Sequence, residues 1–183
     1  MKAAFILGLM VLLVPPKRQE INGEKEADAK ERYSVIAQAI ADESKGDHDV
    51  ARFLTTVVRH ESSFARSVHL GSKKGDGGKS WCLAQINIGT NPKAKTLFTW
   101  YEARSLVGTE YPATRRCVHT AAEFIRMAMR MCKDKPRQSA ERVRCVFLRY
   151  GGVSKEAARL PWVREVIDAR MATYGRLQKL RSR

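Results

Sequence analysis

Acidic residues are scarce in this 183-residue chain, and so are long apolar runs. It has 19 Asp and Glu against 34 Lys and Arg, a formal charge of +15 and a sequence pI near 10.1. This excess implies a polyanionic neighbour, which could be nucleic acid, an anionic lipid surface or a cell-wall polymer. Apolar residues still make up 44% of the chain, so a wholly disordered basic protein is excluded. The length suits one domain that can bury its own core.

The longest apolar run, Ala3 to Val14, has only 12 residues. A membrane-spanning helix takes roughly 20, whereas a run of this length after Lys2 matches the apolar part of an export signal. A small-x-small cleavage site is missing where one is expected, so an uncleaved anchor in the inner leaflet is an alternative. A buried N-terminal helix is disfavoured because the run lacks a polar face. Residues 1–16 are therefore predicted to be an export signal or anchor, which makes the protein periplasmic, secreted or anchored in the inner membrane.

Closely spaced cysteines are also absent. The four cysteines form no C-x-x-C pair, which disfavours a zinc site, while an oxidising compartment would permit disulfides. Cys117 and Cys132 fall on one predicted helix, about 22 Å apart at about 1.5 Å per residue, so these two cannot pair. Cys132 is left with Cys145 or Cys82, and the shorter loop favours Cys145. Unpaired buried thiols are the alternative.

Helical periodicity dominates the rest of the chain. Residues 17–30 are charged and poor in large apolar side chains, which predicts a linker, and residues 31–180 form the predicted folded body. The spacing of apolar residues predicts helices around 33–40, 50–58 (with Asp47 or Asp49 as N-cap), 117–132, 143–147 and from Pro161 onward. The glycine-rich stretch from Gly71 to Gly89 interrupts this pattern. The sequence therefore predicts a mainly α fold with a long central loop or small β-element.

Glu61 occupies a position where helical spacing predicts a hydrophobic residue. The apolar stripe from Val50 to Val58 continues to position 61 on the same face. The opposite face carries residues expected to be solvated: Arg52, Thr55, Thr56, Arg59 and Ser63. A carboxyl group on the apolar side loses hydration, so its pKa rises and it can hold a proton as a general acid. Alternatively, the helix frays and Glu61 reaches solvent or pairs with Arg66 or His60.

The residues around Glu61 carry a resemblance. The segment His60–Phe64 (HESSF), followed after the glycine-rich loop by Ser80–Asn87 (SWCLAQIN), resembles the lytic transglycosylase and goose-type lysozyme families. A third element of that pattern is matched loosely by Tyr150–Gly152. Two positions depart from it, because Cys82 replaces the usual glycine and Gly151 replaces an asparagine. The resemblance covers roughly residues 30 to 178 and implies a lysozyme-like fold.

The resemblance also implies roles for individual residues. Glu61 would be the catalytic acid and then base, with Ser62 orienting it. Gln85 and Asn87 would line the glycan groove, and Tyr150 would face Glu61 across the cleft. Residue type alone also allows Gln85 and Asn87 to be polar positions on a short strand, and Tyr150 to be an ordinary core aromatic. Neither a cofactor nor a metal is implied.

Asp76 decides between two reactions. Glycoside hydrolysis uses two carboxyl groups about 5 to 9.5 Å apart, which is feasible if Asp76 reaches the cleft. If Asp76 instead bonds within its own glycine-rich loop, Glu61 acts alone. Glu61 would then protonate the glycosidic oxygen between MurNAc and GlcNAc and take a proton from the sugar's 6-hydroxyl, the route to a 1,6-anhydro product that the resemblance implies. The route through Glu61 alone is preferred.

Two other classes of function remain open. Arginine clusters such as Arg126 with Arg130 could mark a nucleic-acid surface, but no recognised motif accompanies them and an exported protein rarely meets nucleic acid. A glycan-binding protein without catalysis is the third reading. The preferred prediction is an exported or membrane-tethered enzyme that cleaves peptidoglycan. Its partners would be peptidoglycan, other anionic envelope polymers and, if the N-terminal segment is uncleaved, the membrane; nucleic acid is not expected.

Overall fold

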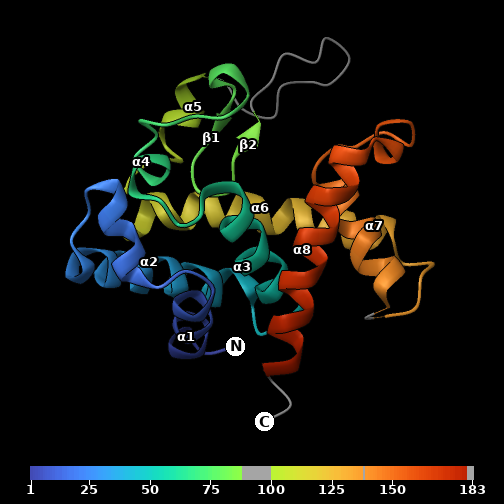
Figure 1. Cartoon of the computed structure of the whole chain (residues 1–183), viewed down its shortest axis with the longest axis horizontal. Coiled ribbons are helices and arrows are strands. Elements are labelled where there is room, and N and C mark those ends of the chain that lie inside the picture. The colour runs from blue at the N-terminus through green and yellow to red at the C-terminus, as the bar shows by residue number, and fades with distance from the viewer. Residues whose placement is uncertain (88–99, 138, 181–183) are drawn as a thin grey trace. The chain divides into compact units, whose positions relative to one another are not determined.

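The computed structural model describes residues 1–87, 100–137 and 139–180. The described chain is mainly helical and carries a small two-stranded sheet, so the predicted fold class, mainly α with a small β-element, is confirmed (Figure 1). It divides into two compact units, Met1–Ala121 and Ala122–Arg183. Helix α6 (Tyr111–Met131) runs from the first unit into the second.

The first unit holds most of the elements. In chain order they are α1 (Ala3–Leu13), the 3₁₀-helix η1 (Pro16–Asn22), α2 (Glu26–Ser44), α3 (His48–Ser62), α4 (Arg66–His69), the 3₁₀-helix η2 (Asp76–Gly78), β1 (Ser80–Trp81), β2 (Ile86–Asn87) and α5 (Trp100–Arg104). After α6, the second unit holds α7 (Ala140–Tyr150), the 3₁₀-helix η3 (Ala157–Arg159) and α8 (Pro161–Lys179). Strands β1 and β2 pair antiparallel, with Ser80 opposite Asn87 and Trp81 opposite Ile86.

Helix α3 begins where the sequence predicts. Asp47, one of the two candidate caps, accepts hydrogen bonds through Oδ1 from the backbone N–H groups of Asp49 (2.8 Å) and Val50 (3.2 Å). The predicted helices around residues 33–40 and 117–132 are present as α2 and α6, and the helix opened by Pro161 is α8. Periodicity missed α4 and α5, which are too short to repeat an apolar stripe.

The predicted solvated face of α3 is wrong over most of its length. Arg52, Thr55 and Thr56 are buried, because α1 and α2 both pack against α3. Two of these side chains have local partners: Arg52 pairs with Asp49 at 2.9 Å, and Thr55 donates to the carbonyl oxygen one turn earlier at 2.8 Å. The helix is therefore a central element of the first unit, and its C-terminal end carries Glu61.

The N-terminal apolar run forms helix α1, which packs against α2 and α3, so the N-terminal helix with a buried face that the sequence disfavoured is present in the structure. Ile6, Leu9 and Met10 are buried, while Phe5 and Leu12 remain 39% and 60% exposed. Within the described residues, no helix has the length and apolar character needed to cross a membrane. The role of this run as an export signal or anchor stays a prediction.

The segment predicted as a linker, residues 17–30, contributes a few buried side chains to the first unit. It contains most of η1 and the start of α2, and both Gln19 and Glu24 are buried. Glu24 forms a two-pronged ion pair with Arg32, at 2.8 and 2.6 Å, and both side chains are almost fully buried. Composition suggested a solvated spacer, but the Glu24 charge of this segment is buried in the first unit, where pairing with Arg32 compensates its loss of hydration.

All four cysteines are paired. The preferred pair, Cys132 with Cys145, is confirmed and joins the end of α6 to α7 in the second unit. Cys82 pairs with Cys117, which links the turn between β1 and β2 to α6 in the first unit. The alternatives of free thiols and of a Cys132–Cys82 bond are wrong.

His69 makes the fold sensitive to acid. It is fully buried on α4, and its Nε2 lies 2.8 Å from the Thr114 hydroxyl. Burial, with a smaller effect of the Arg32 charge, lowers the pKa of His69 to about 3. The ring thus stays neutral in the folded protein, while the unfolded chain takes up a proton near its ordinary pKa of about 6.5. Stability is therefore lost as the pH falls from about 6.5 towards 3, by about 1.4 kcal/mol per pH unit.

Urea unfolding between about pH 7 and pH 4 measures this effect. The free energy of unfolding of the wild type should fall more steeply with acid than that of His69→Gln. If the two curves stay parallel across this range, the histidine does not carry the effect.

Candidate functional site

Glu61 lines a cavity of about 480 Å³ in the first unit. Three of the residues predicted for the site, Glu61, Ser62 and Gln85, lie in its wall. The other lining residues are Asn22, His60, Ser63, Ala65, Val68, Lys73, Lys74 and Gly75. Two separate segments of the predicted motif, the end of α3 and the turn between β1 and β2, therefore meet at one cavity.

Glu61 is half-buried in the last turn of α3. Its exposure is intermediate between that of a side chain buried on the apolar face and that of a side chain in solvent, the two expectations from the sequence. Among the described lining residues it is the single carboxylate, and it shares the wall with Lys73, Lys74 and His60. A partly dehydrated carboxyl group that a ligand can reach meets the geometric requirement for a general acid or base.

The chain turns sharply after Glu61. The Ser62 hydroxyl donates to the Val58 carbonyl oxygen at 2.7 Å and accepts from the Phe64 backbone N–H at 3.2 Å. Ser62 therefore shapes the end of the helix that carries Glu61. Ser63 and Phe64 both have left-handed backbone angles, with φ of 50° and 56°. Such conformations cost about 1 to 3 kcal/mol each and cluster at functional sites.

Phe64 is held in this conformation by packing. Its ring is fully buried and meets Tyr33 edge to face, with 5.3 Å between the ring centroids. The strained turn is thus supported by the core beneath it, as expected for a segment whose geometry must be kept.

Gln85 lies in the turn between β1 and β2, with φ of 48°, and not on a strand as its polar alternation suggested. Its Nε2 donates to the Cys82 carbonyl oxygen at 3.0 Å. Cys82 is in turn bonded to Cys117 of α6. The Gln85 amide is therefore oriented by a turn that a disulfide anchors.

Gly75 leaves room for this amide. A Cβ atom at position 75 would lie 2.3 Å from Gln85 Oε1. Gly75→Ala is therefore expected to displace the Gln85 side chain at little cost in stability, because the clashing atom ends a flexible side chain. Binding of a ligand in the Glu61 cavity should weaken about tenfold, the effect of one lost hydrogen bond of about 1.4 kcal/mol. Thermal unfolding and glycan binding, measured together, test this; the opposite pattern, lower stability with intact binding, would contradict it.

Asp76 and Asn87 bond to each other outside this cavity. The Asp76 Oδ2 accepts from the Ser80 hydroxyl at 2.5 Å and from Asn87 Nδ2 at 3.3 Å. Neither Asp76 nor Asn87 is among the described residues that line the Glu61 cavity. Alternation along β2 explains this for Asn87, because Ile86 is buried and the next side chain points outward. The structure therefore does not bring Asn87 to the predicted site.

Tyr150 is the last residue of α7 in the second unit and is half-buried. Its predicted place opposite Glu61 stays a prediction.

Lys73 and Lys74 are cavity residues that the sequence interpretation missed. The Lys74 ammonium lies 3.7 Å from the centroid of the Trp81 ring, a cation–π contact that ties the glycine-rich loop to β1. Their position in the sequence could have indicated this: both lysines stand directly before Gly75, in the loop that joins the two motif segments.

A second cavity of about 620 Å³ in the first unit was also missed. At its wall the buried Glu43 carboxylate accepts from Arg115 Nε and His119 Nδ1, each at 2.7 Å. Burial acts to raise the pKa of Glu43, but hydrogen bonds from His119 and Arg115 outweigh it and hold that pKa below its ordinary value. The sequence offered one indication of this cavity: Arg115 and His119 are four residues apart, which places them side by side on one helix face.

No protein-family model, curated protein or solved structure matches this chain. In the described ranges, no group of three or more His, Cys, Asp or Glu side chains is placed to hold a metal ion.

Proposed function

We propose that the protein cleaves the glycan strands of peptidoglycan between MurNAc and GlcNAc, with Glu61 as general acid and then general base. The observation that carries this proposal is that Glu61 and Gln85, from the two segments that resemble the lytic transglycosylase motif, line one cavity. The strained turn after Glu61 and the disulfide behind Gln85 support it, since both hold site residues in place.

The proposed reaction needs one carboxyl group. Protonated Glu61 donates its proton to the glycosidic oxygen as the bond between that oxygen and C1 of MurNAc breaks. The resulting carboxylate then accepts the proton of the 6-hydroxyl of the same sugar, whose oxygen bonds to C1 and closes the 1,6-anhydro ring. Glu61 ends protonated, ready for the next strand. The second amide hydrogen and the Oε1 of Gln85 are suited to bind polar groups of the sugar.

The surroundings of Asp76 favour this route over hydrolysis. Hydrolysis would need a second protein carboxyl group about 5 to 9.5 Å from that of Glu61, facing the glycosidic bond. The Asp76 carboxylate in η2 is engaged by Ser80 and Asn87, which pair in the β1–β2 hairpin. Hydrolysis with Asp76 is the second candidate reaction, and the product distinguishes the two.

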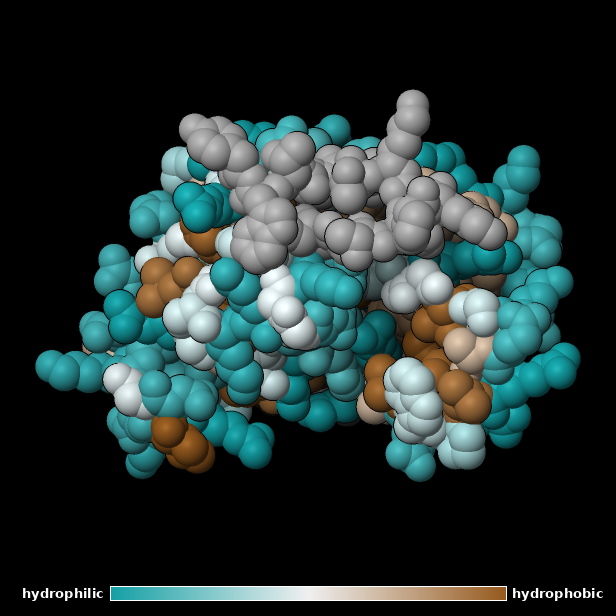
Figure 2. Space-filling model, turned by 90° about the horizontal axis from the view of Figure 1, so that it is seen from above, coloured by the Kyte–Doolittle hydropathy of each residue, from teal (hydrophilic) through white to brown (hydrophobic). Residues whose placement is uncertain are grey.

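The charge and the disulfides support a role at the cell envelope. A formal charge of +15 attracts anionic polymers, and teal, hydrophilic side chains predominate over the described surface in Figure 2. Two disulfides are typical of a protein that works in an oxidising compartment outside the cytoplasm. We therefore infer that the protein is exported and binds peptidoglycan directly.

Mass spectrometry of the fragments released from purified peptidoglycan tests the proposal. A 1,6-anhydro product is expected. A reducing end would indicate hydrolysis, and no released product would remove the enzymatic claim. If the protein binds the wall without turnover, it is a glycan-binding protein; if it binds DNA with a steep salt dependence instead, the basic surface serves nucleic acid.

A further inference from the structure

A third cavity, of about 300 Å³, adjoins the one that contains Glu61. Its lining residues are Val14, Arg18, Gln19, Ile21, Asn22, Arg59 and Ser63, and we call it the arginine pocket. Asn22 and Ser63 line both this pocket and the Glu61 cavity. The two cavities are thus neighbours that share part of a wall, and one ligand could occupy both.

The arginine pocket is built in advance of any ligand. The buried Gln19 donates through Nε2 to the Ser63 carbonyl oxygen (3.1 Å) and to the Tyr33 hydroxyl (2.9 Å). Its Oε1 accepts from Asn22 Nδ2 at 3.2 Å. This network joins η1 to the end of α3 and fixes the spacing of the two pocket walls. Ligand binding therefore does not lose free energy to ordering the walls.

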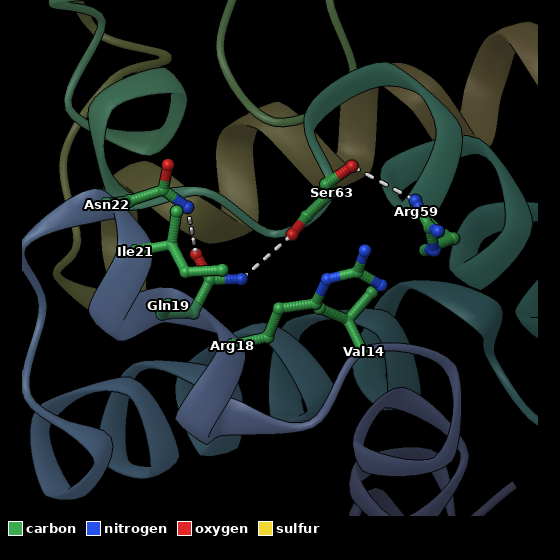
Figure 3. Close-up of a pocket in the computed structure, with 7 residues that line it drawn as sticks. All are labelled: Val14, Arg18, Gln19, Ile21, Asn22, Arg59 and Ser63. Atoms are coloured by element: carbon green, nitrogen blue, oxygen red, sulfur yellow. Dashed lines mark hydrogen bonds between the residues drawn. The ribbon is translucent and has the colours of Figure 1, made fainter.

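Two guanidinium groups give the pocket its charge. Arg59 is half-buried and donates through NH1 to the Ser63 hydroxyl at 3.0 Å, and Arg18 reaches from η1 towards the same space (Figure 3). Burial and the charge of Arg18 both lower the pKa of Arg59. Among the described lining residues there is no carboxylate to compensate these charges.

Such an arrangement favours an anionic ligand. Two like charges that face one partly buried space repel each other, and an anion between them would relieve this repulsion. A guanidinium group pairs with a planar carboxylate through two parallel hydrogen bonds, which makes arginine the suited residue. Ile21, at the same wall, offers apolar contact to the aliphatic carbons that carry such a carboxylate.

We propose that the arginine pocket binds a carboxylate of the peptide stem on the muramyl residue whose glycosidic bond lies at Glu61. This inference rests on the proposed function. The stem branches from the sugar that the Glu61 cavity would hold, and the shared wall at Asn22 and Ser63 places the arginines beside that sugar. The enzyme would therefore prefer strands that still carry stems over bare glycan.

Binding to an inactive variant tests the pocket separately from catalysis. Glu61→Gln protein is titrated with a GlcNAc–MurNAc disaccharide that carries an L-Ala-D-Glu stem, and with the same disaccharide without the stem. The stem should strengthen binding about tenfold or more, the range of a hydrogen bond to a charged group. Adding Arg59→Gln or Arg18→Gln should abolish this difference. Arg104→Gln, an exposed arginine on α5 outside both cavities, is the matched control and should preserve it.

The outcomes separate the pocket from the reaction. Equal affinity for the two disaccharides, or a stem preference that survives both arginine variants, overturns the inference even if the wild type cleaves peptidoglycan. Stem-dependent binding by a wild type that releases no product supports the pocket and rejects the proposed function. Inorganic phosphate is the competing probe: arginine-dependent phosphate binding without a stem preference also overturns the inference. Arg18 is exposed, so its variant remains informative if Arg59→Gln fails to fold.

Discussion

Glu61→Gln is expected to lower kcat for peptidoglycan cleavage by about a thousandfold or more. General acid or base catalysis by one positioned group contributes about 10²- to 10⁴-fold, and Glu61 serves both steps in the proposed route. The amide has nearly the shape of the carboxyl group, so the cavity and KM should change little. Release of soluble fragments from purified peptidoglycan, followed at substrate saturation, measures the loss.

Two control variants make this result specific. Glu31→Gln is the same substitution at an exposed position on α2 and should leave activity unchanged. Asp76→Asn should keep most of the activity, because the Asp76 side chain is engaged within its hairpin. If Asp76→Asn loses activity as completely as Glu61→Gln, the reaction uses two carboxyl groups and the route through Glu61 alone is wrong.

Removing the Cys82–Cys117 disulfide is expected to lower the free energy of unfolding by about 4 kcal/mol. The bond closes a loop of 35 residues, and constraint of the unfolded chain accounts for about this amount. Both cysteines are fully buried, so alanine is the suitable replacement, since serine would add a buried hydroxyl. The double variant should also lose activity, because the disulfide anchors the turn whose backbone carbonyl at position 82 orients Gln85.

The other disulfide supplies the comparison. Cys132–Cys145 closes a loop of 13 residues, so the corresponding double alanine variant should lose about 3 kcal/mol. The carbonyl that orients the Gln85 amide belongs to Cys82. Activity of the Cys132/Cys145 variant, measured below its unfolding transition, should therefore be affected less. Equal stability of the Cys82/Cys117 variant and the wild type in urea would contradict the prediction.

Local signals in the sequence predicted much of the helical framework. Apolar spacing located α2, α3, α6 and α8, and one of the two candidate caps, Asp47, is the residue that begins α3. These predictions succeed because a helix repeats every 3.6 residues and its cap lies next to it in the chain. The same reasoning excluded a Cys117–Cys132 bond, since both residues follow one helix axis.

Burial was not predictable in the same way. Arg52 and the threonines of α3 read as a solvated face, and residues 17–30 as a linker, yet those α3 side chains are buried and so are Gln19 and Glu24. Whether a polar side chain is buried depends on which distant helix covers it and on whether a partner such as Asp49 lies within reach. Neither condition is visible in the local pattern.

By itself the sequence determined the helical class, the excess of basic charge and the choice of Glu61 as the candidate acid, because periodicity, composition and a motif are properties of the chain. Only the tertiary structure decided which residues share a cavity with Glu61. It placed Gln85, Lys73 and Lys74 in the same cavity wall, bonded Asp76 to Ser80 and Asn87, and set the arginine pocket beside the end of α3. The physical reason is that these placements depend on long-range packing, on a disulfide between distant cysteines and on side-chain hydrogen bonds across η1 and α3.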